Sequence, residues 1–363
     1  MRILRTYVLQ EHLAPFFVTM GGLTAVLLIG NIIKFTELVI AKGVSLFDIL
    51  RLIIYLLPYI LTFTVPMACL IAMVLAFGRL SADYELIAIR ASGVAPIRLV
   101  LPMFVVGFVI SGALLIINDR IAPASHLAFR RQLKAIGIKR PTAYLEAGTF
   151  IKEFPPYTIF VYQVEGQKLY NVRIYEPQPN GPTRTIIADR GEFEQLPNRQ
   201  GVRLKLSDGT VDEWDPFHPG SFYKVTFKDY TLSLGSSQDD PASMGKKLKE
   251  LTFKELVAKR KQLGLEGIET LPVDLELHHK IASSFAALLF VSFGLAFGLR
   301  LQHLERLTSF LWVLAVFMLY YLGMIGMNAV ALKGWLPPAL AMWAPNLIGG
   351  VVSGLMVTRT VRR

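Results

Sequence analysis

The chain has 363 residues, of which 53% are apolar and only 18% charged, and its formal net charge is +11. This composition excludes a single cytosolic enzyme and a disordered chain, because the apolar residues gather in long blocks. Its single cysteine, Cys69, lies within an apolar block and has no internal partner for a disulfide, so a disulfide-stapled secreted domain is also excluded.

Six apolar blocks predict membrane-spanning helices. In a bilayer the backbone must satisfy its hydrogen bonds within the segment, so about 20 consecutive apolar residues indicate a spanning helix. The predicted spans cover residues 13–33, 49–77, 99–117, 281–299, 308–330 and 339–357. Pro58 and Pro66 are the predicted kink points of the second span. No signal-peptide cleavage site follows the first block, so we expect it to be retained as a span.

Basic residues in the short loops predict the orientation. The loops on one side carry Arg2, Arg5, Arg79, Arg90, Arg98, Arg300, Arg306, Arg359, Arg362 and Arg363. The short loops on the other side offer only Lys34, Lys42 and Lys333. Because Lys and Arg accumulate on the cytoplasmic side, both termini are predicted to be cytoplasmic and residues 118–280 to lie outside the cytoplasm.

The extracytoplasmic stretch is nearly neutral. Residues 118–280 contain 24 Lys and Arg against 21 Asp and Glu, a net charge of +3. Most of the surplus charge therefore flanks the membrane, where anchoring and attraction to anionic lipid account for it. It gives no support for a nucleic-acid partner.

Short alternating runs from about residue 149 to 235 are typical of antiparallel strands. The runs cover residues 157–164, 168–175, 184–188, 191–196, 202–206, 210–214 and 222–234. About eight strands without intervening helices predict a sandwich, a jelly roll or an open barrel. Such a domain offers an apolar cleft or an edge for another β-domain, or it is a closed sandwich that only caps the membrane part. Leucines among Lys and Glu then predict a surface helix at about 246–263.

The loop between the second and third spans carries the most specific pattern. Ser81 suits a helix N-cap, Asp83 and Glu85 suit the first turns, and Gly93 is a natural stop, so a helix is expected at about 81–93. Because this helix connects two spans, it can transmit a movement of a soluble partner to both of them. The alternative is an amphipathic connector at the membrane surface.

The motif Arg79-Leu-Ser-x-Asp-x-Glu-Leu-x-Ala-x-Arg-Ala-Ser-Gly93 resembles the LptF/LptG permeases of the lipopolysaccharide export ABC transporter. Four further stretches resemble the same family: Leu4-Arg5-Thr6-Tyr7 with Glu11 and Pro15-Phe16, Asn118 with Pro123, Glu276-Leu-His-His-Lys280 and Trp343-Ala-Pro-Asn346. The resemblance covers essentially the whole chain. It implies an α+β membrane protein with six transmembrane helices (3+3) and an inserted periplasmic antiparallel β-jellyroll domain. The expected division is 1–117, 118–280 and 281–363.

The resemblance also implies a function and partners. The expected function is extraction of lipopolysaccharide from the bacterial inner membrane and delivery to periplasmic jellyroll bridge proteins. The expected partners are a cytoplasmic ATPase dimer and a second permease subunit of the same family. The sequence has no G-x-x-x-x-G-K-[ST] phosphate loop, so ATP hydrolysis is expected from the partner rather than from this chain. No catalytic, cofactor or metal site is predicted. A non-transport scaffold that anchors the β-domain remains the alternative.

Carried over from the family, the coupling element to the ATPase contains Asp83, Glu85, Arg90 and Gly93, with Glu85 the foremost acidic residue. Lys34, in Ile32-Ile-Lys-Phe35, and Lys42 are the predicted lipid contacts, because a cation there meets phosphates of the lipid head. The alternatives are a snorkelling interfacial lysine for Lys34 and a solvated loop charge for Lys42.

Transfer of one acyl chain of about 12 carbons from a bilayer into water costs on the order of 10 kcal/mol at ~0.8 kcal/mol per CH₂, so such a lipid needs a continuous apolar path. The strand residues that suit this path are Phe160, Tyr162, Val172, Ile174, Ile186 and Phe193. The sequence does not decide which of them face inward.

Overall fold

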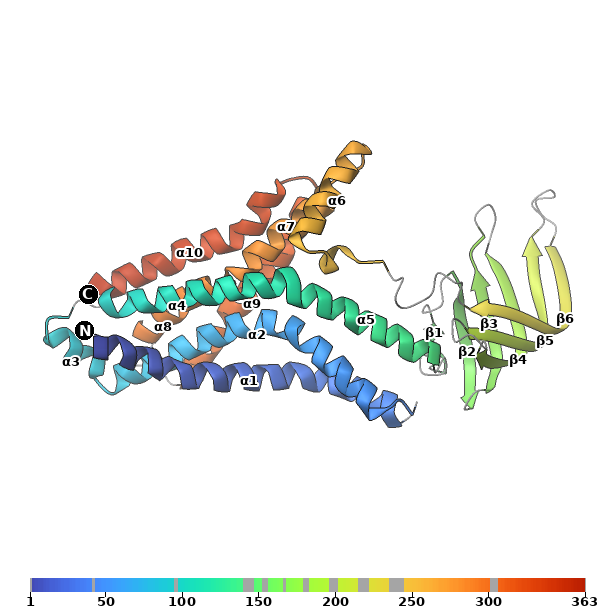
Figure 1. Cartoon of the computed structure of the whole chain (residues 1–363), viewed down its shortest axis with the longest axis horizontal. Coiled ribbons are helices and arrows are strands. Elements are labelled where there is room, and N and C mark those ends of the chain that lie inside the picture. Colours follow the sequence, from blue (N-terminus) through green and yellow to red (C-terminus); the bar gives the residue numbers. More distant parts are fainter. Residues whose placement is uncertain are drawn as a thin grey trace. The chain divides into compact units, whose positions relative to one another are not determined.

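The computed structural model describes residues 2–40, 43–94, 97–139, 147–151, 156–165, 168–178, 183–195, 202–214, 222–234, 245–300 and 306–362. Along the chain, long helices precede and follow an inserted antiparallel sheet, which confirms the predicted α+β class (Figure 1). The chain divides into two compact units. The helical unit contains Met1–Asn31, Ile54–Leu127 and Lys246–Arg363, and the second unit contains Ile32–Ile53 and Ala128–Gly245.

The helices before the sheet are α1 (Arg2–Ile40), α2 (Leu46–Ala82), α3 (Glu85–Ala91), α4 (Ile97–Ile116), the π-helical turn η1 (Ile117–Ile121) and α5 (Ala122–Lys139). The helical elements after it are the 3₁₀ turn η5 (Leu248–Glu250), α6 (Phe253–Leu265), α7 (Leu271–Ser284), α8 (Ala286–Arg300), α9 (Arg306–Leu332) and α10 (Pro338–Arg362). The predicted surface helix at 246–263 thus corresponds to η5 and α6, which are separate elements.

Six helical segments of the described chain are long and apolar enough to cross a membrane, as predicted. Their ends differ from the apolar blocks. The 39 residues of α1 extend about 58 Å at 1.5 Å per residue, well beyond a hydrocarbon core of about 30 Å. Hydropathy locates only the apolar middle of a helix, whereas backbone hydrogen bonding continues it into the polar regions. The fourth span begins at Leu271 rather than near residue 281, and it breaks at Phe285 between α7 and α8.

The sheet lies entirely in the second unit, and its strands pair in chain order. They are β1 (Phe150–Ile151), β2 (Thr158–Glu165), β3 (Lys168–Glu176), β4 (Arg184–Gln195), β5 (Val202–Trp214) and β6 (Phe222–Leu234). The predicted hairpin is present, with Glu165 opposite Lys168. The described strands form an antiparallel meander, and the crossover connections of a jelly roll are not among the described residues.

Six described strands replace the predicted eight or so because β4 and β5 are each continuous. Polar residues at 189–190 and 207–209 favour turns in sequence, but here they belong to a paired ladder. Arg190 pairs with Ser207 and Ala188 with Gly209 on either side of Asp208, which has a φ of 55°. Asp tolerates this left-handed conformation better than most residues, so the ladder continues through it.

One face of the sheet carries a closed apolar core. Ile159, Val172, Ile174 and Ile186 are fully buried, and Phe193 is 6% exposed. Because neighbouring residues of a strand point to opposite faces, the six suggested path residues divide into two groups. Val172, Ile174, Ile186 and Phe193 face this core. Phe160 and Tyr162 do not belong to it; Tyr162 is 49% exposed and meets Phe160 edge to face.

Helix α8 packs closely against α2 in the helical unit. Met73 and Phe77 of α2 are buried in a core with Val291 and Leu295 of α8. The approach is close because α8 carries a Gly-x-x-x-Gly pattern. A Cβ at Gly294 would lie 2.5 Å from Met73 Cβ and 2.7 Å from the Leu70 carbonyl oxygen. Only glycine fits there.

Candidate functional site

The predicted coupling element lies at one end of the helical unit, where the start of α1, the end of α10 and α3 meet (Figure 1). The expected helix at 81–93 is shorter. Helix α2 continues through Ser81, so Ser81 is not an N-cap, and a turn at Asp83 and Tyr84 separates it from α3. Tyr84 has a φ of 59°, which ends the helical path. Gly93, with a φ of +79°, follows the last turn of α3, as predicted.

The acidic residues of this element are held by α1 and α2. The Tyr7 hydroxyl of α1 donates to both carboxylate oxygens of Glu85, at 3.1 and 3.0 Å. Arg79, near the end of α2, pairs with Glu11 of α1 at 2.8 Å and with Asp83 at 3.5 Å. The site therefore includes Tyr7 and Glu11, which the loop motif alone does not identify. The side chain of Arg90 lies outside the described residues.

The apolar core that α2 and α8 share extends beneath these polar contacts. Val8 of α1 is 1% exposed, and it belongs to one cluster with Phe77, Leu80 and Leu86. Leu4 and Tyr7 pack against the same cluster. Residues 4 and 8 share a face of α1, and residues 7 and 11 share the neighbouring face, because residues four apart meet on a helix. This spacing gives α1 an apolar contact and a polar rim against the coupling element.

Lys34 lies in the second unit, where its side chain is exposed on α1. The next residue, Phe35, is 5% exposed and lies 6.5 Å from the ring of Phe129 on α5. Gln132 of α5 donates to Asp48 of α2 at 2.8 Å in the same unit. These contacts hold the helix turn that presents the Lys34 ammonium to its surroundings. Lys42 lies outside the described residues.

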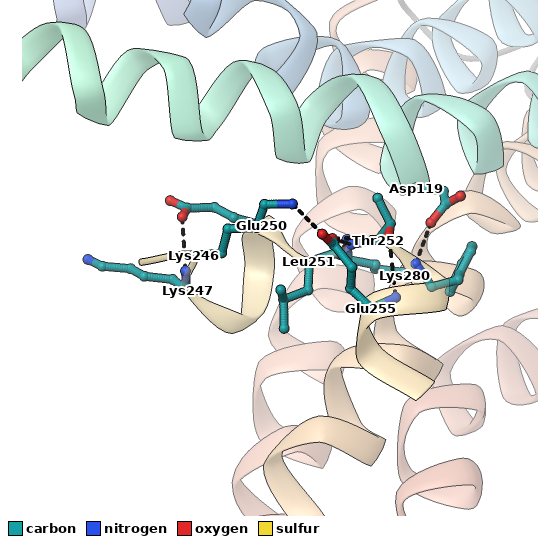
Figure 2. Close-up of polar contacts among 9 residues, drawn as sticks. Asp119, Lys246, Lys247, Glu250, Leu251, Thr252, Glu255 and Lys280 are labelled. Carbon is teal, nitrogen blue, oxygen red and sulfur yellow. Dashed lines mark hydrogen bonds and ion pairs between the residues drawn. The ribbon is translucent and has the colours of Figure 1, made fainter. Parts of the chain in front are cut away.

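A cluster of polar contacts fastens η5 and α6 to the helical unit (Figure 2). Lys280 of α7 is 5% exposed, and its ammonium donates to the carbonyl oxygen of Leu251 at 2.6 Å and to that of Asn118 at 3.2 Å. Asp119 of η1 accepts from the backbone N–H of Phe253 at 2.6 Å. Buried polar groups are stable only when they are paired, and here the pairing joins three chain segments.

The first turn of α6 completes this cluster. Thr252 and Glu255 form a capping box, and Lys246 also binds the Glu255 carboxylate. The hydrogen bond from Lys246, followed by that from the Thr252 backbone, lowers the pKa of Glu255. The sequence shows the stretch from Glu276 to Lys280 as a family-like pattern. The position of Lys280 directly before an apolar span is visible in the sequence, but its burial is not.

A cavity of about 500 Å³ lies in the helical unit, beside Lys280. Its apolar lining includes Phe63 of α2 together with Tyr321 and Ile325 of α9, and its charged lining includes Lys249, Lys280 and Glu276. A pocket of this kind, apolar with a few charged groups, suits an amphiphile. Among the described residues no group of His, Cys, Asp and Glu could hold a metal ion.

Two comparisons with known proteins bear on the family. An uncharacterized protein of Rickettsia prowazekii (strain Madrid E) is 24% identical over 235 residues, which make up 64% of this chain and 64% of that protein. The family model described as lipopolysaccharide export system permease LptF/LptG matches residues 6–359. That match includes α3, the sheet and all six candidate spans apart from the first residues of α1. The chain is therefore a multi-pass membrane protein of the lipopolysaccharide export permease family LptF/LptG.

Proposed function

We propose that this chain is the permease subunit of an ABC transporter that extracts lipopolysaccharide from the inner membrane and delivers it to a periplasmic bridge. The observation that carries the proposal is the family match over residues 6–359. The absence of a phosphate-loop motif from the sequence agrees with hydrolysis of ATP by a partner. The proposed assembly joins this chain to a cytoplasmic ATPase dimer and to a second permease subunit, and the proposed path ends at periplasmic jellyroll proteins.

In this proposal both termini and α3 are cytoplasmic and the sheet is periplasmic. The arginine-rich ends of the helices support that orientation through the positive-inside rule. Asp83, Glu85, Arg90 and Gly93 form the element that meets the ATPase. This role is supported by the position of α3 in the chain, directly between α2 and α4, because a displacement of α3 reaches both spans directly. In the proposal the chain divides into two membrane parts, residues 1–117 and 281–363, and a periplasmic part, residues 118–280.

The proposed lipid contacts are Lys34 and Lys42, whose ammonium groups attract the phosphates of the head. The exposed side chain of Lys34 supports its role. The cavity beside Lys280 offers an apolar wall for acyl chains, and Lys249 in its lining offers a cation for an anionic head. The fully buried inner face of the sheet supplies the apolar residues for the later part of the path, since acyl chains need apolar surroundings throughout.

Reconstitution tests this function against the scaffold alternative. The full chain is purified with its ATPase and second permease, placed in vesicles that contain lipopolysaccharide, and supplied with a periplasmic acceptor protein. We expect ATP-dependent transfer of lipid to the acceptor, and Lys34→Glu reduces it several-fold because it repels the phosphates. Lys333→Glu, in a tight loop on the same predicted side, is the matched control. A complex that hydrolyses ATP but transfers no lipid contradicts the proposal and favours the scaffold.

A further inference from the structure

We infer that Tyr7 and Glu11 are positioning residues for energy coupling: they fix the Glu85 carboxylate and tie α1 to the coupling element, so that movement of α3 also moves α1. This inference rests on the proposed function, because it assigns parts within the coupling of ATP hydrolysis to lipid transfer. It adds a third helix, α1, to the helices α2 and α4 that the chain connects directly to α3.

The bond from Tyr7 orients Glu85 without using up its capacity to bind a partner. A single hydroxyl reaches both oxygens, at 3.1 and 3.0 Å, and therefore fixes the rotation of the carboxylate. An ionised carboxylate has about four acceptor positions, so most remain open to a cation or an N–H of the ATPase. Glu85 is only partly buried, which leaves that approach open.

Glu11 provides the second tie through Arg79. The guanidinium is 2.8 Å from Glu11 on α1 and 3.5 Å from Asp83 in the turn before α3. Glu11 is the better held of the two acids, since its side chain is 21% exposed and that of Asp83 is 55% exposed. Arg79 thus bridges α1 and the turn, and a shift of the turn changes the position of both its partners.

The rest of α1 has few attachments that resist such a movement. Between Val8 and His12 at one end and Phe35 near the other, no residue from 13 to 34 is buried. Among the described residues of this stretch, Phe16 packs against the apolar cluster, and the hydroxyl of Thr24 donates to that of Thr64 on α2 at 3.2 Å. By contrast, 67% of the apolar window of α2 is buried. The ties at Tyr7 and Glu11 therefore decide how the first turns of α1 follow α3.

A double-mutant cycle in the reconstituted complex tests the inference. Tyr7→Phe removes one hydroxyl and keeps the ring that packs on the apolar cluster. We expect lipid transferred per ATP hydrolysed to fall about fivefold, with complex assembly and thermal unfolding unchanged. Glu85→Gln is expected to give a similar loss, and the double variant to lose little more than either single variant, because both changes remove the same interaction. Glu11→Gln is expected to give a smaller loss.

Tyr55→Phe is the matched control, because the Tyr55 hydroxyl on α2 makes no hydrogen bond among the described residues. It leaves the transfer ratio unchanged. The inference is overturned if Tyr7→Phe has no effect, if its loss adds fully to that of Glu85→Gln, or if Tyr55→Phe causes an equal loss. Failure of the proposed function looks different, since in that case the unaltered complex transfers no lipid at all.

Discussion

The span formed by α7 and α8 and helix α1 are both apolar enough to cross a membrane, yet they are held in opposite ways. In the span formed by α7 and α8, 72% of the apolar window is buried, whereas none of the apolar window of α1 is. Helix α8 meets α2 along glycines, so the backbones almost touch. Helix α1 has its buried residues and its ion pair to the helical unit near its start, where Val8 is buried, Tyr7 binds Glu85 and Glu11 binds Arg79.

This difference shows that hydropathy reports membrane insertion and not attachment. An apolar side chain gains little by leaving lipid for a protein contact, so helices associate in membranes through close packing and polar contacts. The α2 and α8 pair associates through close packing and forms a fixed centre. Helix α1 makes polar contacts at one end, which suits an element that moves with its surroundings.

The largest expected effect breaks the fixed centre. Gly294→Ala places a Cβ within 2.5 Å of Met73 Cβ and 2.7 Å of a backbone oxygen, neither of which can rotate away. We expect the free energy of unfolding to fall by about 3 kcal/mol, which is visible as a lower melting temperature of the purified protein in detergent. Gly326→Ala on α9 is the control, because nothing lies within 4 Å of its new Cβ. Equal melting temperatures for both variants would show that α2 and α8 are not in close contact.

The two helices also differ in how much of their role could be predicted from sequence. Six apolar blocks gave the number of spans, because backbone hydrogen bonding in lipid allows few alternatives. Gly294 and Gly298 show the pattern of a close contact, but the sequence does not name α2 as the partner. Likewise, Glu85 stands out within a loop motif, whereas its partner Tyr7 is 78 residues away in the chain. Pairings between distant segments depend on the packed structure.

An intermediate effect separates the held end of α1 from its exposed middle. Val8→Ala removes two methyl groups from a side chain that is 1% exposed, and we expect a loss of about 1.5 kcal/mol in the free energy of unfolding. Val18→Ala, at a side chain that is 73% exposed on the same helix, is expected to cost much less. Chemical denaturation in detergent measures both. If Val18→Ala is the more costly change, α1 is attached through its middle and the comparison with α8 fails.

The polar cluster around Lys280 shows a third kind of attachment that sequence did not reveal. Lysine before an apolar span reads as an interfacial residue, and only the structure shows its ammonium between the carbonyls of Leu251 and Asn118. Those carbonyls carry no side-chain signal, since every residue has one. The start of α6 does carry a sequence signal, because Thr252 and Glu255 have the spacing of a capping box, but the leucine pattern leads to a helix expected from about residue 246.

The smallest expected effect concerns this polar attachment and its dependence on pH. The pKa of Glu255 is lowered by its bonds to Lys246 and Thr252, so the folded-state pKa lies below the unfolded value of 4.5. The ionised carboxylate therefore stabilises the start of α6 at pH values above 4.5, and this contribution is lost as the pH falls through the lower, folded-state pKa. Because the side chain is 38% exposed, we expect only about 0.5 kcal/mol, which salt reduces further.

Amide hydrogen exchange at residues 253–257, followed from neutral pH to below pH 4, measures this loss as weaker protection relative to the intrinsic exchange rate. Glu255→Gln is the matched control, since glutamine also serves in a capping box but does not titrate. The control loses the part of the pH dependence that belongs to Glu255 and keeps the contacts of Asp119 with Phe253 and of Asp274 with Arg260. Identical profiles for the two proteins would assign the attachment of α6 to Asp119 and Lys280 alone.

The protection of α8 around Gly294 is expected to stay constant over the same range, because that contact involves no titratable group. A pH dependence confined to α6 would thus separate the polar attachment of this helix from the close packing at the centre of the unit.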